Sequence, residues 1–374
     1  MTDLFIGLMS GTSLDGVDGV LLRFDGEKPV VARHESAPFA PALKAELLAL
    51  NSAGSNELHR AALAANALAE GYAEVVQQLL RQTGTPASSV AAIGAHGQTV
   101  RHQPGLWDGT GYTLQLNNPA LLAERTGITV VADFRSRDVA AGGQGAPLVP
   151  AFHQGVFGQP GALAWAVNIG GISNLSRMDG REGEPNVRGW DCGPGNALMD
   201  HWCQRHTGQA YDDGGRWAAS GRVIAPLLQS LLAEPYLAQP APKSTGRDLF
   251  HPGWLQAQLA VHGAGAAPAD VQATLTEFTA QAIAQDLLAH GAAAGQCVVV
   301  CGGGALNTHL MQRLAALLPG LPVQASDALG LPPLQVEAAA FAWLARQTLR
   351  RLPGNLPAVT GARGPRVLGA VYPA

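Results

Sequence analysis

The chain has 374 residues, enough for about two domains, and 47% of them are hydrophobic. Only 14% of the residues are charged, against about 25% in an average soluble protein, which favours a large apolar core. A net charge of −4 without a long basic run excludes a nucleic-acid-binding surface, and no apolar span approaches the roughly 20 residues of a membrane helix. We therefore expect a cytoplasmic protein with no nucleic-acid or membrane partner.

The start of the chain carries the most informative pattern. Residues 4–9 form an expected strand that enters a turn of small residues, 10–13, in which Gly11 permits a positive φ or a close backbone approach. Consecutive N–H groups in such a turn can bind an anion. Asp15 and Asp18 follow, and carboxylates beside a phosphate would repel it unless a divalent cation lay between them. The pattern favours phosphate with Mg²⁺, and a β-hairpin with a polar tip is the alternative.

The first half continues with antiparallel strands and then helices, an order that differs from the strand–turn–helix opening of a dinucleotide-binding fold. The pattern predicts strands at residues 17–24, 30–37, 88–95, 112–116 and 128–132, and helices at residues 41–50, 57–82 and 119–126. His96, Gln98 and Arg135 lie at or just after expected strand ends, where open α/β sheets bind ligands. A structural histidine in a turn is the alternative for His96.

The second half begins after a glycine-rich loop at 142–147 and repeats the logic of the first. A strand at 163–169, a small-residue turn at 170–174 and a returning strand at 175–178 form a second hairpin. Two related domains, each offering a hairpin to the phosphates of one nucleotide, would explain the repetition. The four cysteines show no metal-ligand spacing, so we expect reduced thiols at Cys192, Cys203, Cys297 and Cys301.

Three later turns also carry candidate residues. Asp191 precedes a rigid Gly-Pro-Gly turn, after which Asn196 is expected to cap a helix at 197–206. A buried strand at 296–301 leads into the triple glycine 302–304, which lets a flat ligand lie against bare backbone or lets a helix pack closely on the sheet. Asn307 opens the next helix. Glu337 opens the last one, where a partner for the helix dipole is the alternative to a catalytic role.

Together these strings resemble one family, the 1,6-anhydro-N-acetylmuramic acid kinases. The matching segments run over nearly the whole chain: residues 9–18, 96–99, 133–147, 168–174, 191–200, 243–248, 301–307 and 335–342. The family belongs to the sugar kinase, actin and heat-shock chaperone ATPase superfamily. The resemblance implies an α/β fold of two ribonuclease-H-like domains, with mixed sheets flanked by helices and an interdomain nucleotide cleft.

The resemblance also implies a reaction. Enzymes of this family open the anhydro bridge of 1,6-anhydro-N-acetylmuramic acid with water and phosphorylate O6 with ATP and Mg²⁺. The products are N-acetylmuramate 6-phosphate and ADP, formed in peptidoglycan recycling and amino-sugar catabolism. A homodimer is implied as well.

The motifs transfer roles to residues of this chain. Asp191 corresponds to the catalytic base that takes the proton from water attacking C1. Candidates for the sugar are His96, Gln98, Arg135 and Glu337; Arg135 suits the lactyl carboxylate, and Glu337 is a candidate to share the attacking water. Asp15 and Asp18 are expected to reach the metal only through water, with no direct protein ligand to it. The expected nucleotide and phosphate residues are Gly11, Thr12, Ser13, Leu14, Asp15, Gly16, Val17, Asp18, Gly170, Gly171, Ser173, Asn174, Gly302, Gly303, Gly304 and Asn307.

Boundaries and rival functions complete the expectation. The N-terminal domain is expected at residues 1–134, joined by part of 351–374, and the C-terminal domain at 135–350. A kinase of the same superfamily that acts on an ordinary hydroxyl is one alternative, and a non-catalytic ATP-gated binding module is the other. Product analysis separates the first, while the lack of an appended peptide-binding domain argues against the second.

Overall fold

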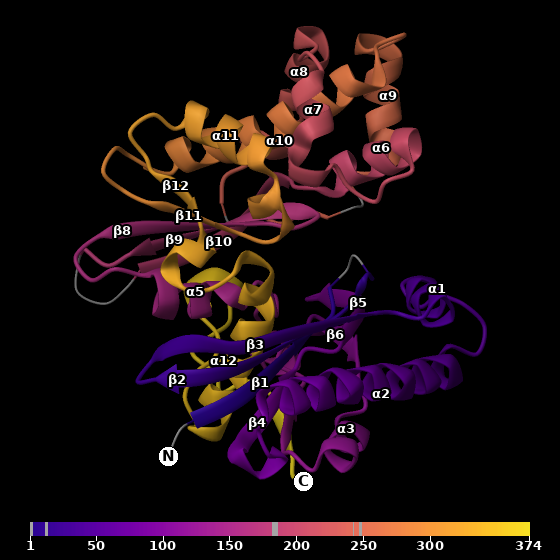
Figure 1. The fold of residues 1–374 in the computed structure, drawn as a ribbon, viewed down its shortest axis with the longest axis vertical. Helices are drawn as coiled ribbons and strands as arrows, with labels where there is room; N and C mark the ends of the chain where they lie inside the picture. Colours follow the sequence, from indigo (N-terminus) through magenta and orange to yellow (C-terminus); the bar gives the residue numbers. More distant parts are fainter. Residues whose placement is uncertain (1–2, 12–13, 182–185, 242, 247–248) are drawn as a thin grey trace. The chain divides into compact units, whose positions relative to one another are not determined.

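The computed structural model describes residues 3–11, 14–181, 186–241, 243–246 and 249–374 (Figure 1). Thr12 and Ser13 of the expected phosphate turn lie outside the described residues. The chain divides into two compact units, Met1–Val156 with Gln335–Ala374, and Phe157–Leu334. These limits differ from the expected boundaries after residues 134 and 350: residues 135–156 belong to the first unit, and so does the last long helix, which packs on its sheet.

The first unit is built on a six-stranded mixed sheet in the order β13-β7-β4-β1-β2-β3. Strands β1, β2 and β3 pair antiparallel, and β4 and β7 continue the sheet parallel to β1. The strands of this sheet are β1 Asp3–Met9, β2 Gly16–Asp25, β3 Lys28–Pro38, β4 Val90–Ala95, β7 Val130–Ala132 and β13 Ala370–Tyr372. A separate two-stranded sheet consists of β5 Gln98–Pro104 and β6 Gly111–Leu116, and the remaining elements of the unit are helices. Its helices are α1 Pro41–Ala49, α2 Glu57–Thr83, α3 Pro119–Thr126, α4 Ser136–Ala140, α5 Val149–Phe157, α12 Val336–Leu349 and α13 Pro357–Thr360.

The second unit has a five-stranded sheet in the order β10-β9-β8-β11-β12. Its first three strands are antiparallel, and β11 and β12 are parallel to β8, so the strand order repeats that of β1 to β4 and β7. The expected fold class, mixed sheets flanked by helices in two related units, is confirmed. The strands are β8 Leu163–Ile169, β9 Ile172–Asp179, β10 Asn186–Pro194, β11 Val298–Cys301 and β12 Val323–Ala325. The helices are α6 Ala197–Thr207, α7 Arg216–Ser220, α8 Ala225–Leu232, α9 Pro252–His262, α10 Pro268–Ala289 and α11 Thr308–Leu317.

Helices cover both faces of the first sheet. Ile6 and Leu8 of β1 are buried among apolar residues of α2, including Tyr72. Gly7 points to the other face, because successive strand residues alternate, and lies against the backbone of α12 at Ala338. The sheet is therefore the middle layer between α2 and α12.

The core of the second unit follows the same alternation. Every second residue of β8 is buried in one apolar cluster with residues of α6, α8, α9, α10 and α11; the β8 members are Leu163, Trp165, Val167 and Ile169. Among the helices, α10 supplies the largest share of this cluster. It lies in the helical layer of the second unit, next to α11 and α7 (Figure 1). Among the described residues, no helix is long and apolar enough to cross a membrane.

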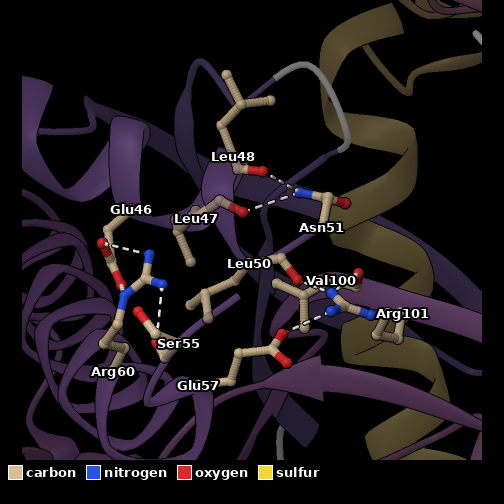
Figure 2. Close-up of polar contacts among 10 residues, drawn as sticks. All are labelled: Glu46, Leu47, Leu48, Leu50, Asn51, Ser55, Glu57, Arg60, Val100 and Arg101. Carbon is tan, nitrogen blue, oxygen red and sulfur yellow. Dashed lines mark hydrogen bonds and ion pairs between the residues drawn. The ribbon is translucent and has the colours of Figure 1, made fainter. Parts of the chain in front are cut away.

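The connection between α1 and α2 is fixed by two arginines (Figure 2). Arg60 of α2 donates from Nε and Nη2 to the carboxylate of Glu46 in α1, at 2.6 and 3.1 Å. Arg101 of β5 donates to Glu57 at 2.6 Å and to the carbonyl of Leu50, the C-terminal cap of α1. The β5–β6 hairpin is thereby tied to both helices. The first residue of β5 is a candidate site residue, so these bonds hold part of the site.

Gly7 and Gly94 are required by the packing of α12 and yield a stability prediction. A Cβ on Gly7 would overlap the carbonyl oxygen of Ala338, and one on Gly94 that of Phe341. We expect Gly7→Ala to lower the free energy of unfolding by about 1–3 kcal/mol, because backbone atoms cannot move aside as a flexible side chain can.

Gly71 provides the matched control, since it lies inside α2 with open space around its Cα. Gly71→Ala should raise the free energy of unfolding by about 0.5–1 kcal/mol, the usual gain of alanine within a helix. Denaturant unfolding measures both variants. A neutral Gly7→Ala would contradict the close approach of α12.

Candidate active site

Candidate residues of the first unit lie at the carboxyl-terminal ends of its parallel strands. Strands β1, β4 and β7 are parallel, so their carboxyl ends meet there, followed by Ser10, His96 and Arg135. The buried Ser10 hydroxyl donates to the carbonyl of Gly97 at 3.0 Å and lies 3.0 Å from the Tyr72 hydroxyl. Tyr72 of α2 also accepts from the Gly97 amide at 3.1 Å, which locks the two loops together.

His96 orients the guanidinium of Arg135 through hydrogen bonds. Its Nε2 lies 3.2 Å from Arg135 Nε and 2.9 Å from Nη2, and its Nδ1 is 3.3 Å from the carbonyl of Ser10. Burial, together with the charge of Arg135, lowers the pKa of His96 to about 3, so the ring is neutral at physiological pH. A neutral ring with its proton on Nδ1 can accept from the guanidinium and donate to Ser10.

Arg135 keeps donors for a ligand after these contacts. Its Nη1 donates to the carbonyl of Gly145 at 2.8 Å, which leaves N–H groups of both Nη atoms without a bond among the described residues. Burial lowers the pKa of Arg135 to about 10, opposed by Glu337 and Asp138, so the group stays cationic. A planar cation held on one side suits a carboxylate ligand on the other.

The loop beneath Arg135 is fixed by a fully buried carboxylate. Asp138 accepts from the Gly145 amide at 2.8 Å, from Asn355 Nδ2 at 2.6 Å and from the Thr360 hydroxyl at 2.7 Å. The C-terminal segment therefore helps to place Gly145, and through it Arg135.

Glu337 and Gln98 complete this group. Burial raises the pKa of Glu337, the charge of Arg135 opposes the rise, and Asp18 adds to it. Gln98 is buried and donates to the carbonyl of Gly11 at 3.1 Å, and its Oε1 has no partner among the described residues. The structure thus brings all four sugar candidates into the first unit.

Several residues expected to bind phosphate in the turn after β1 have structural roles instead. Leu14 has a φ of 57° and is buried among apolar residues near α1, so its side chain serves packing. Gly16 and Val17 lie in β2 and pair with β3. Asp15 is exposed and lies 3.4 Å from Lys44, and Asp18 is half-buried and lies 3.2 Å from His34. Carboxylates that solvent can reach suit a Mg²⁺ ion that keeps most of its waters, and no cluster of three or more metal-ligand residues occurs among the described residues.

Asp191, the expected base, lies in β10 of the second unit, beside a β-bulge. Its Oδ2 accepts from the Ser244 hydroxyl at 2.8 Å and from the Thr245 amide at 3.0 Å. Within the described part of the chain, no hydrogen bond reaches Oδ1. Burial raises the pKa of Asp191, and the bonds from Thr245 and Ser244 oppose the rise. One held oxygen and one open oxygen, on a group whose pKa is raised, suit a proton acceptor.

Glycines surround the ends of β8 and β11, which are parallel. The amides of Gly195 and Asn196 donate to the carbonyls of Gly171 and Gly170 at 3.0 and 2.7 Å. Gly302 has a φ of 78° and packs against Asn168, where a Cβ would clash. Gly304 likewise packs on Ile169, while Gly303 is more open. These turns give a ligand access to backbone and also fulfil the packing role considered as the alternative.

Three polar side chains of these turns form hydrogen bonds within the protein, and a fourth residue, Asn174, is placed by strand pairing. Asn307 caps α11 by accepting from the Leu310 amide at 3.0 Å, as expected of the residue that opens this helix. The prediction for Asn196 was wrong, because its side chain makes no cap bond and donates instead to the carbonyl of Ile169 at 3.1 Å. Ser173 donates to the carbonyl of Pro194 at 3.0 Å. Asn174 lies opposite Asp191 across β9 and β10.

Sequence reasoning missed several residues that hold the site. Ser244 and Thr245 belong to the matching segment 243–248 but received no role, and Tyr72 and Asp138 were not singled out. Each contacts a partner far along the chain or beyond its own element, so no local periodicity marks it. The available signals were the matching segments 243–248, which contains Ser244 and Thr245, and 133–147, which contains Asp138.

Comparisons with known proteins bear on the whole chain. The family model described as anhydro-N-acetylmuramic acid kinase matches residues 3–374. The protein named anhydro-N-acetylmuramic acid kinase of Variovorax paradoxus (strain S110) is 67% identical over 374 residues, covering 100% of this chain and 99% of that protein. Those of Albidiferax ferrireducens and Cupriavidus pinatubonensis are 61% and 60% identical, over 100% and 99% of this chain and 100% and 98% of those proteins. The chain therefore belongs to the anhydro-N-acetylmuramic acid kinase family and is a kinase.

Proposed function

We propose that this kinase uses ATP to open the 1,6-anhydro bridge of 1,6-anhydro-N-acetylmuramic acid with water and to phosphorylate O6. The products are N-acetylmuramate 6-phosphate and ADP, formed in the recycling of cell-wall sugars. The single observation that supports this best is the match of the family model to residues 3–374. A cytoplasmic location and a homodimer stay predictions from the resemblance.

Asp191 is the proposed base. Water attacks C1 of the sugar, its proton passes to Oδ1 of Asp191, and its oxygen becomes the C1 hydroxyl. The C1–O6 bond breaks, O6 takes the electron pair and attacks the γ-phosphorus of ATP, and ADP leaves. Ser244 and Thr245 hold the other carboxylate oxygen, so that Oδ1 faces the water.

Arg135 is the proposed partner of the lactyl carboxylate. Its remaining Nη donors can form two parallel bonds, while His96 and the carbonyl of Gly145 fix the plane of the guanidinium. Gln98 offers its unpartnered Oε1 to a sugar hydroxyl or amide. Glu337, whose pKa burial raises, is proposed to share the attacking water.

The phosphates are proposed to lie against Gly11 and the turns at Gly170, Gly171 and Gly302–Gly304. Backbone amides in such turns stabilise charge on transferring phosphoryl groups. Mg²⁺ bound to ATP, through waters held by Asp15 and Asp18, would neutralise charge that moves to ADP.

Labelled water tests the reaction itself. Incubation of the protein with 1,6-anhydro-N-acetylmuramic acid, ATP and Mg²⁺ in ¹⁸O-water should give a 6-phosphate that carries one ¹⁸O at C1. N-acetylmuramate 6-phosphate incubated in the same water controls for exchange. A kinase for ordinary hydroxyls would instead phosphorylate free N-acetylmuramic acid without label, and an ATP-gated binding module would form no sugar phosphate.

Asp191→Asn tests the base. Turnover should fall by at least about 1000-fold, within the range that a positioned acid or base supplies, while ATP and sugar still bind. In the unmodified protein, the base acts only when deprotonated and burial raises its pKa. The value of kcat/KM should therefore fall with decreasing pH at a midpoint above about 3.9, the ordinary aspartate value. Near-normal turnover of the variant would overturn the assignment.

Arg135→Lys tests the carboxylate contact, since lysine keeps the charge but cannot form two parallel bonds. We expect KM for the sugar to rise about tenfold or more, the effect of about 1.4 kcal/mol of lost binding. The same anhydro sugar without its lactyl group serves as the control substrate. An equal loss with both substrates would show that Arg135 acts on something other than the lactyl carboxylate.

A further inference from the structure

Three consecutive residues outside β10, Lys243 to Thr245, form hydrogen bonds with Asp191. The amide of Asp191 donates to the carbonyl of Lys243 at 3.0 Å, and its carboxylate accepts from Ser244 and Thr245. Residues 243–246 belong to no helix or strand. Among the described residues, only that one backbone bond joins the segment to β10, so side-chain contacts have to fix its position.

The Lys243 side chain supplies that contact. It points into the interior, with only 2% of the side chain exposed. Its Nζ donates to the carbonyl of Leu237 at 2.9 Å, lies 3.8 Å from Asp286 Oδ2 and sits 5.3 Å from the centre of the Tyr236 ring. A buried ammonium group is costly unless it is paired and hydrogen-bonded, and these contacts meet both conditions.

Asp286 of α10 joins this lysine to the strand of the base. Its Oδ2 accepts from Trp190 Nε1 at 2.7 Å, and its Oδ1 lies 3.0 Å from His290 Nδ1. Trp190 directly precedes Asp191 in β10. One buried carboxylate thus contacts the neighbour of Asp191 in the strand and the neighbour of Ser244 in the segment.

We propose that Lys243 and Asp286 are positioning residues: their buried ion pair anchors the segment 243–245, and the segment aims the Asp191 carboxylate at the water. The proposal rests on the proposed role of Asp191 as the base. Neither residue touches the reacting atoms. Both act through the two bonds that hold Oδ2.

Lys243→Met is the first test. It is read out through the pKa of Asp191, which a loss of stability alone would not change. Loss of the anchor should weaken the bonds from Ser244 and Thr245, which lower the pKa of Asp191. We expect that pKa to rise by about one unit, and kcat to fall about tenfold with KM for ATP nearly unchanged. The pKa is measured on ¹³C-labelled aspartate carboxyls without substrate, with Asp191→Asn to assign the signal.

Other groups that face this region do not obscure the readout. Burial raises the pKa values of Cys192 and Tyr236, so neither titrates in the acid range. Asp286 and His290 also lie nearby, and Asp286→Asn assigns the signal of that carboxyl. The acid limb of kcat/KM provides a second measurement of the same shift.

A double variant separates positioning from stability. Lys243→Met alone leaves Asp286 buried without its ammonium partner, whereas Lys243→Met with Asp286→Asn leaves no unpaired charge. The double variant should regain much of the lost thermal stability and still show the raised pKa of Asp191 and the low kcat. Recovery of kcat together with stability would overturn the positioning role.

Two further variants keep the test decisive. Ser244→Ala removes one bond to Asp191 at an exposed residue, so it should fold and raise the same pKa even if the lysine variant does not. Glu277→Gln is the matched control, because it breaks another ion pair of α10, to Arg313 at 2.7 Å, without a contact to the segment. It should lower stability but leave the pKa of Asp191 unchanged.

The outcomes also distinguish the two proposals. Full turnover in Asp191→Asn would reject the base, and the substrate-free pKa measurement would still show whether the segment holds Asp191. An inactive Asp191→Asn combined with an unchanged Asp191 pKa in both Lys243→Met and Ser244→Ala would reject the positioning role alone.

Discussion

The contact between α12 and the first sheet is the constraint on which the first unit depends. Gly7 and Gly94 let the helix backbone lie directly on β1 and β4, at Ala338 and Phe341. This depth sets where the first turn of α12 ends up, and with it the Glu337 carboxylate. The Phe341 ring then lies 4.6 Å from that of His96. Two residues without side chains therefore determine the surroundings of the polar group at the strand ends.

Burial affects His96 and Arg135 differently, so the two side chains have different roles in this group. His96, expected to contact the sugar, is surrounded by protein and beside a cation, which makes protonation unfavourable and turns the ring into an acceptor for Arg135. Arg135 tolerates the same burial because a guanidinium holds its proton more firmly and has donors to spare. The histidine orients the arginine, and the arginine keeps N–H donors that can bind a ligand.

Much of the fold was predictable from the sequence, because strands and turns there have local causes. The hairpins at the start of each half, the helix opened by Asn307 and the gathering of His96 and Arg135 at parallel strand ends are examples. The side chain of Asn196 was predicted wrongly, since a residue suited to a helix cap found a better partner in the carbonyl of Ile169. The grip of Ser244 and Thr245 on Asp191 joins segments that only tertiary packing brings together. The contact of α12 with the first sheet has the same kind of cause, because this helix returns to strands that lie far earlier in the chain.

The repeated strand order carries two different chemistries at equivalent sheet edges. In the first unit the strand ends lead to side chains with charge or hydrogen-bonding groups, among them His96 and Arg135. In the second unit the ends of β8 and β11 lead to glycines, which expose backbone. Side chains discriminate between sugars because each polar group has a defined direction, whereas backbone amides suit phosphates that are alike in every nucleotide. Duplication of one sheet followed by this divergence therefore gives the two units different binding groups at the same place in the fold, directional side chains in the first and exposed backbone in the second.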